Sequence, residues 1–121
     1  MSVAPLIAVV DDDSSFREAL VDLMMFAGFR VEAFASGEAV LGSPRLDAFE
    51  GFLLDVQMPG LDGLAVLKGL RSRGVKAPAV FVTSRDDDAL RERARAAGAL
   101  AVFGKPFDAD QLVGLLRTAL A

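Results

Sequence analysis

Five short apolar segments alternate with segments in which apolar residues recur at helical spacing, and this alternation limits the fold more than any other feature of the sequence. Alternating strands and helices are typical of a parallel sheet with right-handed crossovers and with helices on both faces. The apolar segments, which we predict to be strands, are Pro5–Val10, Phe29–Phe34, Phe49–Leu54, Pro78–Val82 and Leu100–Phe103. The sequence therefore predicts an α/β fold built on one doubly wound parallel sheet.

The polarity of the second predicted strand indicates how the strands are ordered. Arg30 and Glu32 make it the most polar of the five, which suits a position at the edge of the sheet. We therefore expect a flavodoxin-like (βα)5 arrangement with the strand order 2-1-3-4-5.

The first predicted helix follows the first strand closely. Ser15 and Glu18 predict a capping box at its start, with Asp13 as a second capping acid or a solvated one. Phe16 belongs to the apolar stripe of this helix, and we expect the cluster Met24–Phe26 near its end to pack in the core.

Length and composition limit the function classes that remain. A chain of 121 residues without repeats or linkers predicts one domain over residues 1–121. The absence of histidine and cysteine excludes Ser-His-Asp catalysis, thiolate chemistry and cysteine-built zinc sites. A net charge of −4 is a poor match to nucleic acid. No apolar run is long enough for a membrane span, and Met1–Pro5 lacks the charged lead of a signal peptide, so we expect a cytoplasmic location.

Polar residues stand where the predicted strands end. Asp11 and Asp12 follow the first strand, Asp55 the third, Thr83 the fourth and Lys105 the fifth. In an open α/β sheet the ligand crevice lies outside the carboxyl ends of the strands, where the strand order reverses. We therefore expect these side chains to converge in one pocket.

The charges of this pocket predict its ligands. Three carboxylates that lie close together raise one another's pKa, and a single lysine does not balance them. Oxygen donors without imidazole or thiolate favour a hard divalent cation, which we expect to be Mg²⁺. Its open coordination positions suit phosphate oxygens, so Asp55 is the candidate nucleophile for an aspartyl phosphate. Lys105 would neutralise charge on the phosphoryl group, and Thr83 would donate a hydrogen bond to it.

Four motifs together resemble the receiver domain of bacterial two-component response regulators. The motifs are Val9-Val10-Asp11-Asp12, Leu54-Asp55-Val56-Gln57-Met58-Pro59-Gly60-Leu61-Asp62-Gly63, Val82-Thr83-Ser84 and Lys105-Pro106-Phe107, and the match covers essentially the whole chain. The resemblance implies that Asp55 accepts phosphate from a histidine kinase or a histidine phosphotransfer protein. It also implies that Asp12, Asp55 and the backbone carbonyl of Gln57 hold Mg²⁺, with Asp11 assisting through water.

The resemblance has further implications for switching. Lys105 would pair with the phosphoryl group, Thr83 would move toward it, and Lys105–Pro106 would be a cis peptide. The third predicted strand and the turn after it look most like the subgroup that carries a C-terminal helix-turn-helix domain and regulates transcription. Phosphorylation would shift the face formed by the fourth helix, the fifth strand and the fifth helix, with homodimer formation as one possible outcome.

One position departs from the family pattern. The family usually has Tyr or Phe three residues before the lysine, whereas this sequence has Val102 there. Phe103 follows it and should point to the opposite face of the sheet, because side chains alternate along a strand. This departure leaves aromatic coupling between Thr83 and the output face open. Gln57 and Arg85 flank the site, where they could alter the lifetime of the aspartyl phosphate.

Two other functions stand beside the phosphorylation switch. A phosphatase with an aspartate nucleophile would need a second acid two residues after Asp55, but Gln57 supplies an amide there. A receiver-like interaction module that binds its partner regardless of phosphate is compatible with Val102. The run of Arg91, Arg93 and Arg95 is expected to be a solvated helix face.

Overall fold

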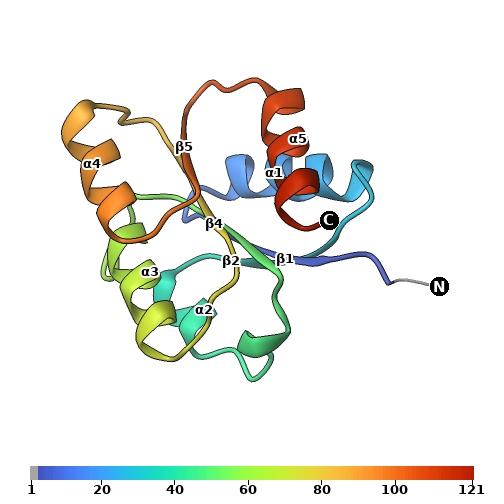
Figure 1. Ribbon diagram of the computed structural model, residues 1–121, viewed down its shortest axis with the longest axis horizontal. Coiled ribbons are helices and arrows are strands. Elements are labelled where there is room, and N and C mark those ends of the chain that lie inside the picture. The colour runs from blue at the N-terminus through green and yellow to red at the C-terminus, as the bar shows by residue number, and fades with distance from the viewer. Residues whose placement is uncertain (1–2) are drawn as a thin grey trace.

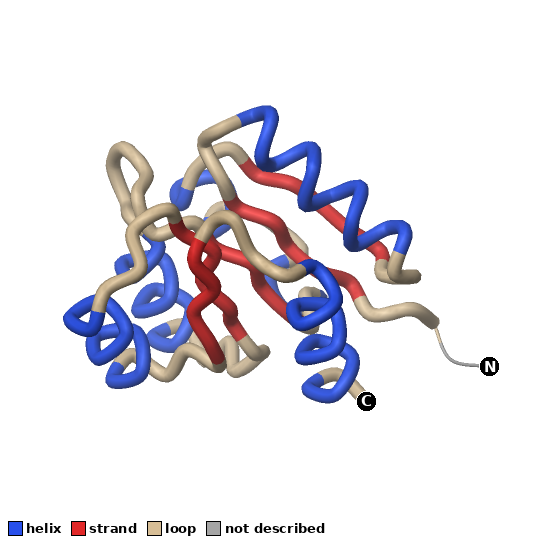
Figure 2. The backbone as a smooth tube through the Cα atoms, turned by 90° about the horizontal axis from the view of Figure 1, so that it is seen from above, coloured by secondary structure: helices blue, strands red, loops and turns tan. Residues whose placement is uncertain are grey.

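Residues 3–121, which the computed structural model describes, form a parallel sheet between two groups of helices (Figures 1 and 2). In chain order the elements are β1 (Leu6–Val10), α1 (Ser14–Phe26), β2 (Arg30–Phe34), α2 (Gly37–Leu41), a 3₁₀ turn (Leu46–Ala48), β3 (Gly51–Leu54), α3 (Gly63–Ser72), β4 (Ala79–Thr83), α4 (Asp88–Ala96), β5 (Ala101–Gly104) and α5 (Ala109–Ala119). The predicted alternation is confirmed, and the 3₁₀ turn is an element that the sequence did not predict.

The sheet has the predicted strand order. β2, β1, β3, β4 and β5 lie side by side and all pairs are parallel. Every residue of β1, β3 and β4 is buried, whereas β2 at the edge exposes Arg30 and Ala33. Continuous apolar strands are therefore central, because helices cover them on both faces.

Alternate residues of each strand contribute to two separate cores. Leu6, Ala8 and Val10 pack toward α2, α3 and α4, whereas Ile7 and Val9 pack toward α1 and α5. Figure 1 shows these two groups of helices on opposite sides of the strands. The same alternation separates the neighbouring residues of β5, so the prediction that they face opposite ways is confirmed: Val102 packs against the first core and Phe103 against the second.

The start of α1 differs from the prediction. The N-cap is Asp13, whose Oδ1 accepts hydrogen bonds from the backbone N–H groups of Ser15 (3.0 Å) and Phe16 (3.2 Å). The predicted capping box of Ser15 and Glu18 is therefore wrong, and Asp13 as a cap is confirmed. Ser15 lies inside the first turn of α1, where its backbone N–H has no partner within the helix. The carboxylate of Asp13 accepts the hydrogen bond from this N–H.

The end of α1 also differs. Met24 is fully buried, but Met25 and Phe26 are 61% and 93% exposed, so the predicted core cluster is wrong for two of its three residues. Consecutive residues on a helix point about 100° apart, and only one side of α1 contacts the sheet. Among the described helices, no segment combines the length and apolar character that crossing a bilayer requires.

Candidate functional site

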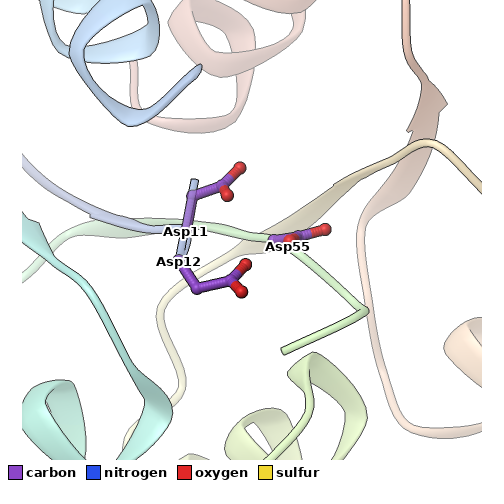
Figure 3. Close-up of side chains that lie close together, drawn as sticks. All are labelled: Asp11, Asp12 and Asp55. Carbon is purple, nitrogen blue, oxygen red and sulfur yellow. The ribbon is translucent and has the colours of Figure 1, made fainter. Parts of the chain in front are cut away.

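Two carboxylates meet at the carboxyl end of the sheet because β1 and β3 are neighbours. Val10 and Leu54 are partners at the ends of these strands, so Asp11 and Asp55, the next residues, lie side by side. Asp12 joins them from the loop before α1. Each of the three offers a carboxylate oxygen, and these oxygens lie within 4.8 Å of one another (Figure 3). The predicted convergence of Asp11, Asp12 and Asp55 is confirmed.

Asp11 is held rigidly from several sides. Its side chain is 1% exposed; Oδ1 accepts from the backbone N–H of Asp13 (2.9 Å), and Oδ2 accepts from the Lys105 ammonium (3.2 Å). The backbone N–H of Asp11 donates to the carbonyl of Phe34 in β2, and the carbonyl of Asp11 accepts from the Arg17 guanidinium (2.8 Å). Asp12, by contrast, is exposed and leaves its carboxylate accessible to solvent.

Burial and charge act together on Asp55. The pKa of Asp55 is raised from 3.8 to about 6, first by burial and second by the negative charge of Asp11. The Lys105 ammonium, 3.9 Å from Oδ1, and a hydrogen bond from the Gln57 backbone N–H lower the pKa, but by less. The carboxyl group of Asp55 is therefore mostly ionised near neutral pH and becomes protonated in mild acid.

Lys105 reaches the carboxylates from the loop after β5. The Lys105–Pro106 peptide bond is cis, as the resemblance implied. The backbone N–H of Lys105 donates to the carbonyl of Thr83 (2.7 Å), which ties this loop to the end of β4. The ammonium lies 3.9 Å from the centre of the Phe16 ring, a contact that sequence reasoning missed. No local pattern could have revealed it, because Phe16 and Lys105 come from opposite ends of the chain.

Thr83 closes the site on the β4 side. It is fully buried, and its hydroxyl oxygen accepts from the backbone N–H of Arg85 (3.0 Å), so it organises its own loop and does not cap α4. Asp87 is the cap of α4 and also pairs with Arg85 (2.9 Å). The side chain of Gln57 is exposed, and its amide oxygen accepts from the hydroxyl of Ser84 (3.4 Å).

The arrangement can receive an anionic group beside a buried carboxylate. The exposed Asp12, the buried Asp11 and the Lys105 ammonium surround Asp55. The Thr83 hydroxyl lies at the end of the neighbouring strand β4. The response regulator receiver domain profile matches residues 7–117. The chain belongs to this family. Receiver domains are signalling modules that interact with histidine kinases, and this receiver domain is therefore not an enzyme that turns over a substrate.

The receiver domain is similar to part of longer regulators. It is 38% identical to the response regulator protein TmoT of Ectopseudomonas mendocina, covering 95% of this chain and 52% of the relative. It is 37% identical to the C4-dicarboxylate transport transcriptional regulatory protein DctD of Rhizobium meliloti, covering 98% of this chain and 26% of that protein. The chain thus spans about half, or less, of the curated relatives it matches.

Solved structures support the same fold. The chemotaxis protein CheY4 of Vibrio cholerae superposes with a TM-score of 0.88 at 26% identity, covering 97% of this chain and 99% of that one. The response regulator StyR superposes with a TM-score of 0.87 at 35% identity, covering 97% of this chain and 59% of that one. Both the predicted fold and the predicted receiver function are confirmed.

Proposed function

We propose that Asp55 is the phosphoacceptor of this receiver domain and takes its phosphoryl group from a histidine kinase or a histidine phosphotransfer protein. The observation that supports this assignment is the placement of the Asp55 carboxylate between an acidic pair and the Lys105 ammonium at the carboxyl end of β3. Asp11 is already bound to Lys105 and to the Asp13 N–H, and Asp12 is exposed, so Asp55 is the central carboxylate.

The transfer needs few protein groups. An ionised oxygen of Asp55 attacks phosphorus, the P–N bond to the donor imidazole breaks, and its electron pair stays on the nitrogen. The product is an acyl phosphate on Asp55. Lys105 would pair with a phosphoryl oxygen, and the Thr83 hydroxyl, which can still donate its proton, would bind another.

A magnesium ion fits the donor set. Three carboxylate oxygens within 4.8 Å of one another form a hard, oxygen-only site. The pKa of Asp55 is raised by burial and then by the negative charge of Asp11, and a divalent cation would offset both causes. Asp12 and Asp55 would bind the ion together with the Gln57 carbonyl, and Asp11 would assist through water. When bound, the ion neutralises charge that develops on the transferring phosphoryl group.

The output of the switch is the face formed by α4, β5 and α5, which would change conformation on phosphorylation and control an output domain or a partner. Homodimer formation is one form that this response can take. A helix-turn-helix output for transcription regulation stays a prediction, and with a net charge of −4 we assign no nucleic-acid binding to these residues. We also propose a cytoplasmic location, which is consistent with membership of the response regulator receiver family.

One observation favours a second function, partner binding that is independent of phosphate. Val102 packs against the α2, α3 and α4 side of the sheet, at the position where the family usually has an aromatic ring. A partner that binds with equal affinity to unmodified and phosphorylated protein would favour this function over the switch.

The test is intact-protein mass after incubation with acetyl phosphate, with Mg²⁺ or with a chelator. We expect wild-type protein to gain one phosphoryl mass only with Mg²⁺, and Asp55→Asn to gain none. Asp47→Asn, which removes a carboxylate from the 3₁₀ turn, is the matched control and should behave as wild type. Equal labelling of Asp55→Asn and wild type would show that another residue is the acceptor.

A further inference from the structure

We infer that Phe16 is a positioning residue for Lys105: its ring holds the ammonium beside Asp55, ready to pair with the phosphoryl group. This inference rests on the proposed function, since it gives Phe16 a role in the phosphorylation of Asp55. Phe16 is part of none of the motifs that led to the site residues.

The contact has the geometry of a cation–π interaction. The Lys105 nitrogen lies 3.9 Å from the ring centre, well inside the distance at which an ammonium is attracted to the face of an aromatic ring. The lysine side chain is 18% exposed, so it is largely shielded from water, and shielding strengthens such contacts. Asp11 at 3.2 Å and Asp55 at 3.9 Å are the acidic partners of the same ammonium.

The ring is itself fixed in place. Asp13 caps α1 and binds the backbone N–H of Phe16, which sets the residue in the first turn of the helix. Phe107, from the loop that carries Lys105, packs edge-on against Phe16 with ring centres 6.0 Å apart. Phe103 of β5 packs in the same manner against Phe107, at 6.3 Å. Three aromatic rings thus join α1 to the segment on which the lysine stands.

The ring does something that the two carboxylates cannot do. Asp11 and Asp55 bind the ammonium through oxygens that the proposed metal site also needs. The Phe16 ring attracts the ammonium through its π face and offers no oxygen, so this attraction does not compete for the carboxylate oxygens that the proposed metal site would use. Phe16 therefore keeps the lysine over the site when its acidic partners are engaged elsewhere.

Two substitutions separate the ring from its bulk. Phe16→Leu and Phe16→Met both remove the aromatic face and leave an apolar side chain, and Met fills space most flexibly if Leu perturbs folding. Phe16→Tyr keeps the ring of this half-buried residue and adds only a hydroxyl. Phe26→Leu is the matched control, because it removes a 93% exposed aromatic ring from the opposite end of α1.

The first measurement is the initial rate of Asp55 labelling by acetyl phosphate with Mg²⁺. We expect Phe16→Leu and Phe16→Met to slow labelling about fivefold or more, whereas Phe16→Tyr and Phe26→Leu stay within about twofold of wild type. Circular dichroism of each variant confirms that it is folded. The second measurement is the NMR signal of the Lys105 ε-methylene protons, which the Phe16 ring current should shift upfield. With three lysines in the chain, the signal can be assigned by a Lys105→Arg variant.

The outcomes distinguish this inference from the proposed function. Wild-type protein that is never labelled at Asp55 overturns the proposed function, and the role of Phe16 with it. If wild type is labelled and both aliphatic variants are equally fast, or if Phe26→Leu is slowed as much as they are, the inference alone is overturned. An ε-methylene signal that stays in place when the Phe16 ring is removed overturns it too, whatever the labelling rates.

Discussion

The Asp55 carboxylate is unfavourable for folding while it is ionised, because it is buried beside Asp11. The folded protein therefore binds a proton at Asp55 more tightly than the unfolded chain does, with a pKa of about 6 against the ordinary 3.8. It follows that the contribution of Asp55 to stability is least unfavourable at low pH, becomes more unfavourable as the pH rises between these two values, and is constant above them.

Asp55→Asn removes this charge and should stabilise the metal-free protein. We expect a gain of about 2 kcal/mol in the free energy of unfolding at neutral pH, shrinking toward zero at about pH 4, where wild-type Asp55 is protonated. Urea unfolding of both proteins in the presence of a chelator, across this pH range, measures the difference. A gain that is the same at every pH would contradict the raised pKa.

The charged residues of the site could be predicted from the sequence, but the burial and the neighbouring side chains of these residues could not. Asp11, Asp12, Asp55 and Lys105 were found because each stands at a strand end, and repulsion between the carboxylates follows directly. Burial, the largest cause of the raised Asp55 pKa, depends on how the loops close over the site. The Phe16 ring over Lys105 depends on how α1 lies relative to β5, which no local pattern describes.

At the scale of elements, α3 begins directly against the backbone that carries Asp55. A Cβ atom on Gly63, its first residue, would overlap the carbonyl oxygen of Asp55 and lie 2.9 Å from the Cα of Val56. The backbone N–H of Gly63 also donates to the carbonyl of Val56 (2.9 Å). This close approach sets the path of the chain after β3.

Gly63→Ala should therefore force these segments apart. We expect a loss of about 2–3 kcal/mol in the free energy of unfolding and slower labelling of Asp55, because the carboxylate moves with its backbone. Gly114→Ala in α5 is the matched control: nothing lies within 4 Å of its added Cβ, so it should stabilise the helix by about 1 kcal/mol. Thermal unfolding measures the change in stability of each variant. Equal changes would show that the close approach of Gly63 to the backbone of Asp55 does not restrict the residue at this position.

Elements were easier to predict than their ends. The strands were identified from continuous apolar segments, and the main helices from apolar residues that recur at helical spacing. The cap of α1 was placed two residues late because Asp13 and Ser15 are both good capping residues and only the folded backbone selects one. Phe26 was assigned to the core by its hydrophobicity, whereas the rotation of α1 on the sheet leaves it in solvent.

At the scale of the whole molecule, a metal ion bound to the folded state should stabilise the entire domain. Any ligand that binds the folded protein and not the unfolded chain raises the free energy of unfolding by mass action. We expect the melting temperature of wild type to rise with Mg²⁺ concentration and the rise to be much smaller in Asp12→Asn. Asp12 is exposed, so this variant should fold normally without the ion.

Asp22→Asn is the control for this prediction. It removes another exposed acid, from α1 about two turns beyond the site, and should respond to Mg²⁺ as wild type does. Differential scanning fluorimetry with matched Ca²⁺ and NaCl series separates ion binding from general screening. Equal responses of the two variants would mean that the stabilising ion binds elsewhere.

The polar edge of the sheet has a consequence for how copies of this domain behave in a crowded solution. An unpaired strand edge can recruit a strand from another molecule and so begin aggregation. On β2, the Arg30 guanidinium donates to the carbonyl of Ala4 and Glu32 pairs with Arg45, so this edge strand carries charged side chains. Recruitment there would bury these charges, so this edge of the sheet is protected against the addition of a foreign strand.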